Sequence, residues 1–482
     1  MEEHENSKDI FNVVQRCIEI LHFLHLKMDA DECKNYLSGI LFYKYLSDSF
    51  LIRAYDLLFD EKPEDMNEAM DAYCKALEDD DTAEALKEEL KRKYRYIIEP
   101  DLTYTSIAEA ARNGAFNREC LQMAFNNIEQ SDPIFTDIFN YVNLYSNLLG
   151  NEDQRQTHAI ASLIKEIDNI DLLNSDDKLI GDSYEYLIHI FASGTGKMTG
   201  EFYTPQAVSE IMTRIAISGQ AEKKELSVYD ACMGSGSLLL KANRFSLDSM
   251  NIRFYGQELN MSTYNLARMN MFFHGVDPWN QHLRNGDALG EDWPTGEETE
   301  FDMVLMDPPY SARWYAVEKN LEDGRFRKYG VLAPKSRADY AFLLHGLYHL
   351  KSSGTMAIVL PQGVLFRGGA EERIREKLLR SGNIYAVIGL PDNLLYYTSI
   401  QTCIIVLKKH RGDRNALFID ASKKFDRIGK QNVMMDEHIN EVLALYTRRE
   451  TIENESCLAT FENIENNNFN LKITEYTDVL EG

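Results

Sequence analysis

The sequence predicts an α/β protein with an all-helical N-terminal domain, a doubly wound parallel sheet and a helical C-terminal tail, at residues 1–165, 166–425 and 426–482. Up to about residue 165, apolar residues recur at the spacing of amphipathic helices, for example over 10–26 and 36–58. From about residue 200, short apolar segments alternate with amphipathic stretches, which is typical of a parallel sheet covered by helices. The C-terminal tail is strongly polar and helical in pattern.

Seven short apolar segments are expected to form strands, and five helical stretches precede or separate them. The strands are expected at residues 226–230, 253–258, 282–287, 301–306, 355–360, 385–390 and 403–407. The helices are expected at residues 206–217, 237–248, 262–274, 339–350 and 370–379. In a doubly wound sheet, ligands bind at the carboxyl ends of the strands, so residues that follow the strands are the first candidates for a site.

The composition is typical of a globular protein, with 44% hydrophobic and 27% charged residues. The acidic N-terminus and the absence of long uncharged apolar runs predict neither a signal peptide nor a membrane span. Seven scattered cysteines without a C-x-x-C pair predict reduced thiols in a cytoplasmic protein without a metal site. The segment G-T-G-K-M at 194–198 lacks the first glycine and the final Ser or Thr of a phosphate-binding loop.

The segment D-A-C-M-G-S-G-S joins the first expected strand to a helix. Asp230 ends the strand, and Gly234, Ser235, Gly236 and Ser237 form the turn. Glycine allows close approach of a ligand to the backbone, and the start of a helix offers free N–H donors. An acid at this place suits a cationic amino group, and the spacing does not fit G-x-G-x-x-G, so an amino-acid-bearing cofactor is favoured over a dinucleotide. The alternative is a purely structural turn.

Two further acids are expected at the ends of the next two strands. Glu258 is placed to accept the ribose hydroxyls of an adenosine, as acids do in other doubly wound nucleotide-binding folds. Asp287 is placed to accept a hydrogen bond from an exocyclic adenine amine. Any one of these acids alone is more often just a solvated strand end. Three acids on consecutive strands favour a cofactor site.

The tetrapeptide Asp307, Pro308, Pro309 and Tyr310 closes the strand expected at 301–306. Two prolines stiffen the backbone and remove two N–H donors, which leaves local carbonyls free to accept hydrogen bonds. Asp307 and the Pro308 carbonyl can together hold an exocyclic NH₂ group, and Tyr310 offers a flat face for a purine. The alternative is an acidic turn without a chemical role.

These motifs resemble those of amino-group DNA methyltransferases, in which D/N-P-P-Y/F is the catalytic motif and D-x-x-x-G-S-G the cofactor motif. More narrowly, the chain resembles the modification (M) subunit of type I restriction–modification systems over roughly residues 8–450. The closer match is carried by M-D-A at 28–30, L-F-Y-K-Y-L-S-D-S-F at 41–50, G-D-S-Y-E-Y-L-I at 181–188, G-E-F-Y-T-P at 200–205, P-Q-G-V-L-F-R-G-G-A at 361–370, G-L-P at 389–391 and T-S-I at 398–400.

The resemblance implies a Rossmann-like, S-adenosylmethionine-dependent methyltransferase domain that methylates the N6 amine of adenine in DNA. It implies that one segment lies against the methionine part of the cofactor, namely Glu201, Phe202, Tyr203, Thr204, Pro205 and Gln206. It also implies that residues 235–237 lie beside that part, that Glu258 binds the ribose and that 307–310 is catalytic. The family usually has Asn at the place of Asp307 and proline at the place of Gln401; Asp is common in other adenine-N6 enzymes.

The resemblance further implies double-stranded DNA as substrate, a separate specificity (S) subunit that reads the sequence, two M subunits with one S, and in some complexes a restriction (R) subunit. The formal net charge of −26 agrees, because a protein that binds DNA alone is usually basic. We expect the N-terminal domain and the C-terminal tail to serve DNA closure and subunit contact. The alternatives are a self-sufficient adenine-N6 methyltransferase and a non-catalytic scaffold of a restriction complex.

Overall fold

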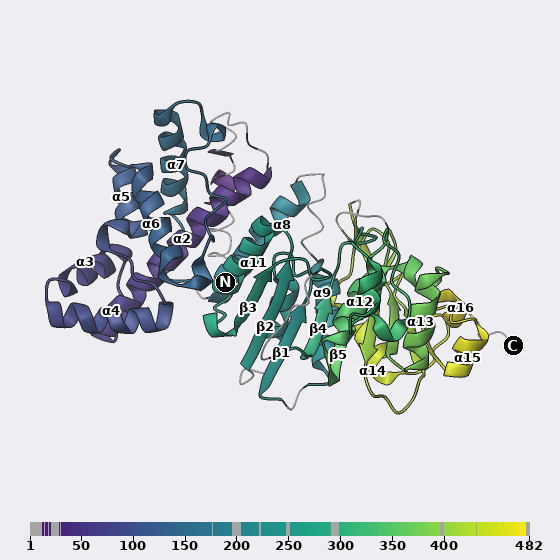
Figure 1. The fold of residues 1–482 in the computed structure, drawn as a ribbon. Helices are drawn as coiled ribbons and strands as arrows, with labels where there is room; N and C mark the ends of the chain where they lie inside the picture. The colour runs from purple at the N-terminus through teal and green to yellow at the C-terminus, as the bar shows by residue number, and fades with distance from the viewer. Residues whose placement is uncertain are drawn as a thin grey trace. The chain divides into compact units, whose positions relative to one another are not determined.

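The computed structural model describes residues 12–13, 15–17, 19–20, 28, 30–175, 177–194, 204–220, 223–246, 251–290, 298–395, 400–429 and 431–478. The chain divides into two compact units (Figure 1). The first comprises Met1–Thr195 and Arg268–Pro278, and the second comprises Gly196–Ala267 and Trp279–Gly482. Among the helices described, none is long and apolar enough to cross a membrane.

The first unit is built from helices, which confirms the helical N-terminal domain. Its longer helices are α2 (Ala30–Phe59), α3 (Met66–Ala76), α4 (Asp80–Tyr94), α5 (Tyr104–Arg112), α6 (Arg118–Ser131), α7 (Asp153–Ile167) and α8 (Asp177–Gly194). Short polar residues begin several of them: the Asp65 carboxylate accepts the N–H groups of Asn67 and Glu68 at the start of α3. Buried aromatic rings fill the core, with Phe125 stacked on Phe139 at 4.2 Å between ring centroids.

The second unit contains one large, mostly parallel sheet. Its strands are β1 (Glu225–Asp230), β2 (Asn251–Glu258), β3 (Gln281–Asn285), β4 (Phe301–Met306), β5 (Leu350–Pro361), β6 (Ile384–Gly389), β7 (Thr402–Lys408), β8 (Ala416–Asp420) and β11 (Ser456–Ala459). The nine strands lie in the order β11-β8-β6-β7-β5-β4-β1-β2-β3. Strands β1 to β5 pair in parallel, whereas β7 runs antiparallel between β5 and β6. The predicted α/β class is therefore confirmed.

Helices cover both faces of this sheet. They include α9 (Gln206–Ile217), α10 (Ser237–Phe245), α11 (Met261–Phe273), α12 (Asp339–Tyr348) and α13 (Ala370–Arg380). Val304 and Met306 of β4 belong to a core that also holds residues of α12 and α13. Met303 and Leu305 point to the opposite face, because side chains alternate along a strand, and they are also fully buried. Helix α9 contacts β4 and β5, so the sheet is doubly covered.

The expected elements are found with small shifts at their ends, and the C-terminal region differs more. The third strand ends at Asn285, two residues before Asp287. The helix expected at 339–350 ends at Tyr348, because β5 begins at Leu350. After residue 425, helix α14 (Asp436–Arg448) and the short helices α15 (Phe461–Asn466) and α16 (Thr474–Thr477) agree with a helical tail.

The expectation of a helical tail misses three short strands. Strands β9 (Asp426–Ile428) and β10 (Gln431–Val433) form a separate hairpin, and β11 joins the edge of the main sheet antiparallel to β8. Each has three or four residues, which is too few for an alternating apolar pattern to be visible in the sequence. The pairing of β11 with β8 is a tertiary effect that the local sequence does not encode.

Candidate active site

The carboxyl ends of three neighbouring strands bring three acids to one edge of the sheet. Strands β4, β1 and β2 lie side by side in that order and run parallel. Asp230 is the last residue of β1, Glu258 is the last residue of β2, and Asp307 directly follows β4. Because the carboxyl ends of neighbouring parallel strands meet at one edge of the sheet, the three acids share that edge.

The glycine turn after β1 is fastened to β2. Gly234 and Gly236 have φ values of +56° and +79°, a region that side chains with a Cβ rarely adopt. The Met233 N–H donates to the Gln257 carbonyl at 2.9 Å. A Cβ at Gly256 of β2 would collide with the Met233 sulfur, so the turn lies directly on the neighbouring strand. Gly236 is the N-cap of α10, which begins at Ser237, as the sequence predicts.

Glu258 holds this turn through its carboxylate. Its Oε2 accepts the N–H of Gly234 at 3.1 Å, and its Oε1 accepts the N–H of Asn260 at 2.7 Å. A carboxylate has about four acceptor positions, so one carboxylate can hold two backbone N–H groups and also accept from other donors. The acid proposed to bind a ribose is thus positioned by two backbone donors on different loops.

Asp230 is buried at the floor of the same edge, with a relative exposure of 1%. Its Oδ1 accepts the N–H of Cys232 at 2.9 Å. Burial, opposed by the hydrogen bond from Cys232 and reinforced by the charges of Asp307 and Glu258, raises the pKa of Asp230 to about 8. Such a carboxyl group is ready to ionise when a cationic group binds beside it.

Two hydroxyl groups fix the carboxylate of Asp307. Thr204 donates to Oδ2 at 2.9 Å, and Tyr310 donates to Oδ1 at 2.7 Å. Desolvation raises the pKa of Asp307 to about 6, although both hydrogen bonds act in the opposite direction. The turn that Pro308 and Pro309 stiffen therefore presents one oriented carboxylate at the end of β4.

Ser311, the residue after this turn, has a strained backbone and is held by a hydrogen bond to Asp339. Ser311 has a φ of +53°, which is uncommon for a residue other than glycine. Its N–H donates to Asp339 Oδ1 at 2.8 Å, and Arg367 donates to Asp339 Oδ2 at 3.1 Å. Glu371, also buried, lies 3.5 Å from the same guanidinium. Sequence reasoning missed this support; its only signal was Arg367 in the 361–370 motif, because Asp339 looked like an ordinary start of a helix.

The remaining predicted site residues have less defined roles in the structure. Asp287 lies in the turn after β3, where its Oδ1 accepts the N–H of Leu289 at 3.0 Å. Ser235 and Ser237 share a hydrogen bond of 3.0 Å between their hydroxyl groups. Pro205 precedes α9, and Gln206 is its first residue. The predictions for Glu201, Phe202 and Tyr203 fall outside the described residues.

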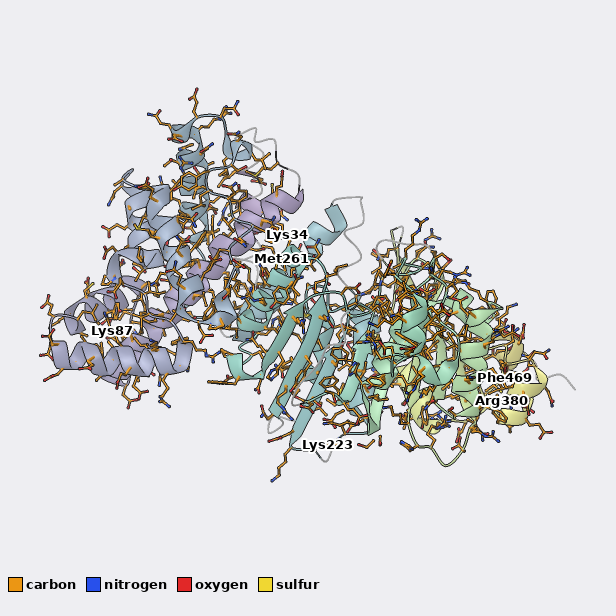
Figure 2. The ribbon with its side chains drawn as sticks, in the orientation of Figure 1. Lys34, Lys87, Lys223, Met261, Arg380 and Phe469 are labelled. Carbon is orange, nitrogen blue, oxygen red and sulfur yellow. The ribbon has the colours of Figure 1, made fainter. Side chains whose placement is uncertain are left out.

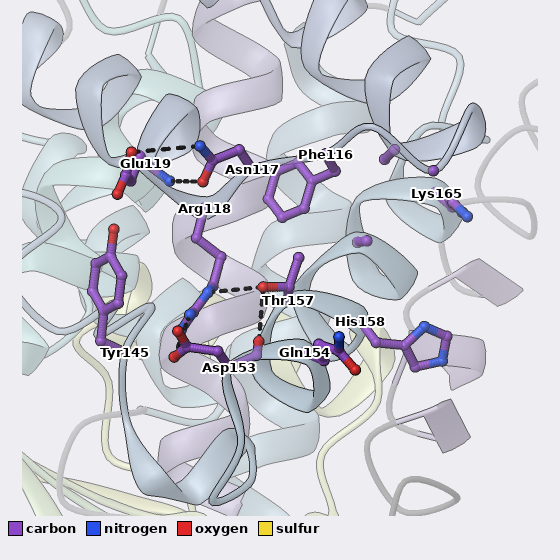
Figure 3. Close-up of a pocket in the computed structure, with 13 residues that line it drawn as sticks. Phe116, Asn117, Arg118, Glu119, Tyr145, Asp153, Gln154, Thr157, His158 and Lys165 are labelled. Carbon is purple, nitrogen blue, oxygen red and sulfur yellow. Dashed lines mark hydrogen bonds and ion pairs between the residues drawn. The ribbon is translucent and has the colours of Figure 1, made fainter.

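The first unit has a separate pocket of about 470 Å³ that holds none of the predicted site residues. Figure 3 shows Arg118 reaching toward Asp153 and Thr157 on its wall. The guanidinium donates to Thr157 Oγ1 at 3.0 Å and to Asp153 Oδ1 at 2.9 Å, and it also donates to the Leu144 carbonyl at 2.9 Å. The guanidinium of Arg118 is bound by residues of the pocket wall and by the carbonyl of Leu144, so its contacts are those of a structural residue.

Two family models match the chain. One is described as N-6 DNA Methylase and matches residues 175–481; the other is described as HsdM N-terminal domain and matches residues 18–167. Together they cover both of the main regions that the sequence predicts.

Known proteins and structures resemble the chain along most of its length. The methylase subunit of the type I restriction enzyme MpnII of Mycoplasma pneumoniae is 33% identical, over 99% of this chain and 91% of its own length. The methylase subunit of HindI of Haemophilus influenzae is 29% identical, over 63% of this chain and 69% of its own. A crystal structure of the type I restriction-modification system methyltransferase subunit from Streptococcus thermophilus has 48% identity and a TM-score of 0.94, over 98% of this chain and 100% of that one.

A more distant structure shares the fold alone. It is a class I S-adenosylmethionine-dependent methyltransferase from Listeria monocytogenes, with 16% identity and a TM-score of 0.50 over 72% of this chain and 98% of that one.

Proposed function

The chain belongs to the family of type I restriction–modification methylase subunits and is an S-adenosylmethionine-dependent adenine-N6 DNA methyltransferase, and on that premise we propose that Asp307, Pro308, Pro309 and Tyr310 form its catalytic turn. The main support is the carboxylate of Asp307, which two hydroxyl groups orient. It lies at the edge of the sheet that also holds Asp230 and Glu258. Preorganised acceptors of this kind act on the transition state without reorganisation during the reaction.

The residues at this edge fit S-adenosylmethionine. Buried Asp230 suits the ammonium of the methionine part, and the Glu258 carboxylate, at the end of β2, suits the ribose hydroxyls because it is an acceptor of hydrogen bonds. We assign Asp287 to the adenine amine. The turn lets the cofactor approach the backbone closely; it consists of Gly234, Ser235, Gly236 and Ser237. Residues 201–206 complete the proposed site against the methionine part. When bound, the cofactor supplies a sulfonium-activated methyl group for transfer to N6.

Asp307 orients the target amine. Its oxygens each accept one hydrogen bond from the protein and keep lone pairs that accept an N–H of the exocyclic amine. Together with the Pro308 carbonyl, this draws the nitrogen lone pair out of conjugation with the ring and toward the methyl donor. Asp307 also stabilises the positive charge that develops on N6 and can take the proton that N6 loses. Tyr310 presents its ring to the face of the flipped base.

The charge and the resemblance to the family together indicate the partners of the reaction. A protein that binds DNA alone usually has a net basic surface, and this chain has a net charge of −26. On the resemblance to the family, we assign sequence recognition in double-stranded DNA to a separate S subunit bound by two copies of this chain, with an R subunit added in a restricting complex. Residues 1–165 and 426–482 are assigned to DNA closure and subunit contact, and 166–425 to catalysis. The seven free cysteines agree with a cytoplasmic location.

The test is methylation of duplex DNA by this chain with and without the S subunit, with methylated adenines mapped by sequencing. Methylation should require both chains. The Asp307→Ala variant should abolish it while leaving the affinity for S-adenosylmethionine within a few-fold. Retained activity in that variant would refute the assignment, and site-specific methylation by the chain alone would instead identify a self-sufficient enzyme.

A further inference from the structure

The segment that follows the catalytic turn is folded back on itself near the turn. The N–H of Trp314 donates to the carbonyl of Lys335 at 3.1 Å, and the N–H of Ala338 donates to the carbonyl of Ala312 at 2.9 Å. The indole N–H of Trp314 donates to the carbonyl of Pro334 at 3.1 Å. We call residues 312–315 with 334–338 the paired segment.

The paired segment is basic, in contrast to the chain as a whole. Residues 311–317 and 331–338 contain Arg313, Lys335 and Arg337 and no Asp or Glu. Arg313 and Lys335 are exposed, and within the described part of the chain neither side chain has an acidic partner. Only Arg337 pairs with an acid, Glu371, at 3.9 Å. The backbones that carry Arg313 and Lys335 run close together, because the N–H of Trp314 donates to the carbonyl of Lys335.

The same segment exposes an aromatic ring. Tyr315 has a relative exposure of 85%. Its neighbour Trp314 is anchored instead, with its ring 5.5 Å from that of Phe326. An exposed aromatic ring on a segment that also carries exposed cations is a combination that nucleic acids recognise, because bases stack on rings and phosphates pair with cations.

The distance to the catalytic turn is short. Arg313 follows Tyr310 by three residues, so its Cα lies at most about 11 Å away even for a fully extended chain. Ser311, between them, is fixed by Asp339 at 2.8 Å. A base that reaches Asp307 therefore brings its flanking phosphates within reach of the two cationic side chains, which extend beyond the backbone.

We propose that the paired segment binds the phosphodiester backbone of the DNA strand that carries the target adenine, through Arg313 and Lys335, with Tyr315 against an adjacent sugar or base. This inference rests on the proposed function and adds to it a DNA contact made by this chain itself. The contact does not read the sequence, because phosphates are the same at every site. It positions the strand so that the flipped adenine enters beside Tyr310.

The experiment uses the complex of this chain with its S subunit and a DNA duplex that the complex methylates, beside a duplex without the site. Arg313→Ala and Lys335→Ala should each weaken binding of both duplexes by a similar factor. Each should also lower the slope of log Kd against log salt by about 0.9, the value for one phosphate contact in a duplex. The affinity for S-adenosylmethionine should stay within two-fold. Lys224→Ala is the matched control and should change neither the Kd for DNA nor the salt slope. Lys224 is exposed and directly precedes β1, at the end of that strand opposite to Asp230.

Three results separate the possibilities. If the wild-type complex transfers no methyl group, the proposed function fails. If the wild-type complex is active and the variants keep its Kd and salt slope, only the DNA contact is refuted. If the variants assemble poorly with the S subunit while assembled complexes bind DNA normally, the paired segment binds a protein partner, and the DNA contact is again refuted.

Discussion

The hydroxyl of Thr204 donates a hydrogen bond of 2.9 Å to Oδ2 of Asp307, although the two residues are 103 positions apart in the chain. Thr204 lies two residues before α9, and Asp307 follows β4. The bond therefore couples the segment assigned to the methionine part of the cofactor to the turn assigned to the target base. With Tyr310 on the other oxygen, the direction of the carboxylate is set by two separate parts of the chain.

The acid limb of the pH profile should belong to Asp307. Its pKa is raised to about 6, so the carboxylate is ionised above that pH and protonated below it, where one acceptor for the amine is lost. Single-turnover methylation by the complex should fall as the pH drops through about 6. Asp307→Asn introduces the residue that the family usually has at this place. This variant should remain active and should lose the acid limb of the pH profile. A limb that persists in Asp307→Asn would assign it to another group.

A change at Thr204 tests independently whether the acid limb of the pH profile belongs to Asp307. Thr204→Val removes a hydrogen bond that lowers the pKa of Asp307, so the limb should move to higher pH. The rate at pH 8 should fall by about tenfold, the equivalent of about 1.4 kcal/mol, because a hydrogen bond to a charged group is worth about 1.5–3 kcal/mol. Thr204→Ser keeps the hydroxyl and is the matched control. Equal profiles for the Val and Ser variants would mean that the hydroxyl does not act on Asp307.

Binding of S-adenosylmethionine should release a proton from Asp230. The pKa of this buried acid is raised to about 8, so near pH 7 most of it is protonated before a cation binds. An ammonium beside it favours the ionised form, so affinity should increase as the pH rises toward 8. Calorimetry at pH 7 in buffers of different ionisation enthalpy measures the protons released. Asp230→Asn should weaken binding and abolish that component, whereas an unchanged release would exclude Asp230 as its source.

Much of this site is visible in the sequence because its parts are local. The glycine turn, the acids that end β1 and β2, and the turn after β4 each adjoin a strand with a clear apolar pattern, and the fold brings parallel strand ends together. The contacts of Thr204 with Asp307 and of Asp339 with Ser311 are different. They join residues 103 and 28 positions apart, and nothing in the local pattern states which acid a hydroxyl group or a backbone amide will contact.

The strain at Ser311 should be measurable through Asp339. Asp339 accepts the N–H of Ser311, whose φ of +53° costs roughly 1 kcal/mol for a residue with a Cβ. Asp339→Asn weakens that anchor and leaves Arg367 with Glu371 as its acidic partner, so the methylation rate should fall while S-adenosylmethionine affinity is kept. Ser311→Gly adopts the same backbone without strain. The double variant should therefore recover part of the rate lost in Asp339→Asn; purely additive losses would show that Asp339 does not act through Ser311.

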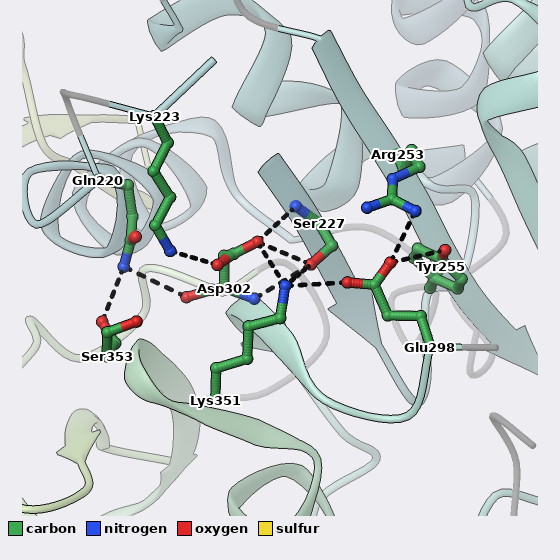
Figure 4. Close-up of polar contacts among 9 residues, drawn as sticks. All are labelled: Gln220, Lys223, Ser227, Arg253, Tyr255, Glu298, Asp302, Lys351 and Ser353. Atoms are coloured by element: carbon green, nitrogen blue, oxygen red, sulfur yellow. Dashed lines mark hydrogen bonds and ion pairs between the residues drawn. The ribbon is translucent and has the colours of Figure 1, made fainter. Parts of the chain in front are cut away.

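A polar cluster at the opposite end of the sheet should govern the acid stability of the second unit. Figure 4 shows Asp302 between Lys223, Ser227 and Lys351; Lys223 is also labelled at this end of the sheet in Figure 2. Lys351 Nζ lies 3.0 Å from Asp302 Oδ2 and 2.9 Å from Glu298 Oε1. Desolvation of Asp302 acts to raise its pKa, but the hydrogen bonds from Lys223, Lys351 and Ser227 outweigh it and lower the pKa to about 2.

Because the folded pKa of Asp302 is depressed, its stabilisation is present above pH 4 and is lost as the pH falls toward 2. The shift corresponds to about 2 kcal/mol of unfolding free energy, and Asp302→Asn should cost at least that at pH 7 and much less near pH 2. Urea unfolding can be followed by tryptophan fluorescence, because Trp279 and Trp314 belong to the second unit. Glu300→Gln is the matched control: Glu300 is 56% exposed in its pair with Lys409, so its loss should cost less than about 1 kcal/mol. Equal costs for the two variants, or a cost for Asp302→Asn that does not shrink in acid, would show that the cluster is not a charge-stabilised anchor of the sheet.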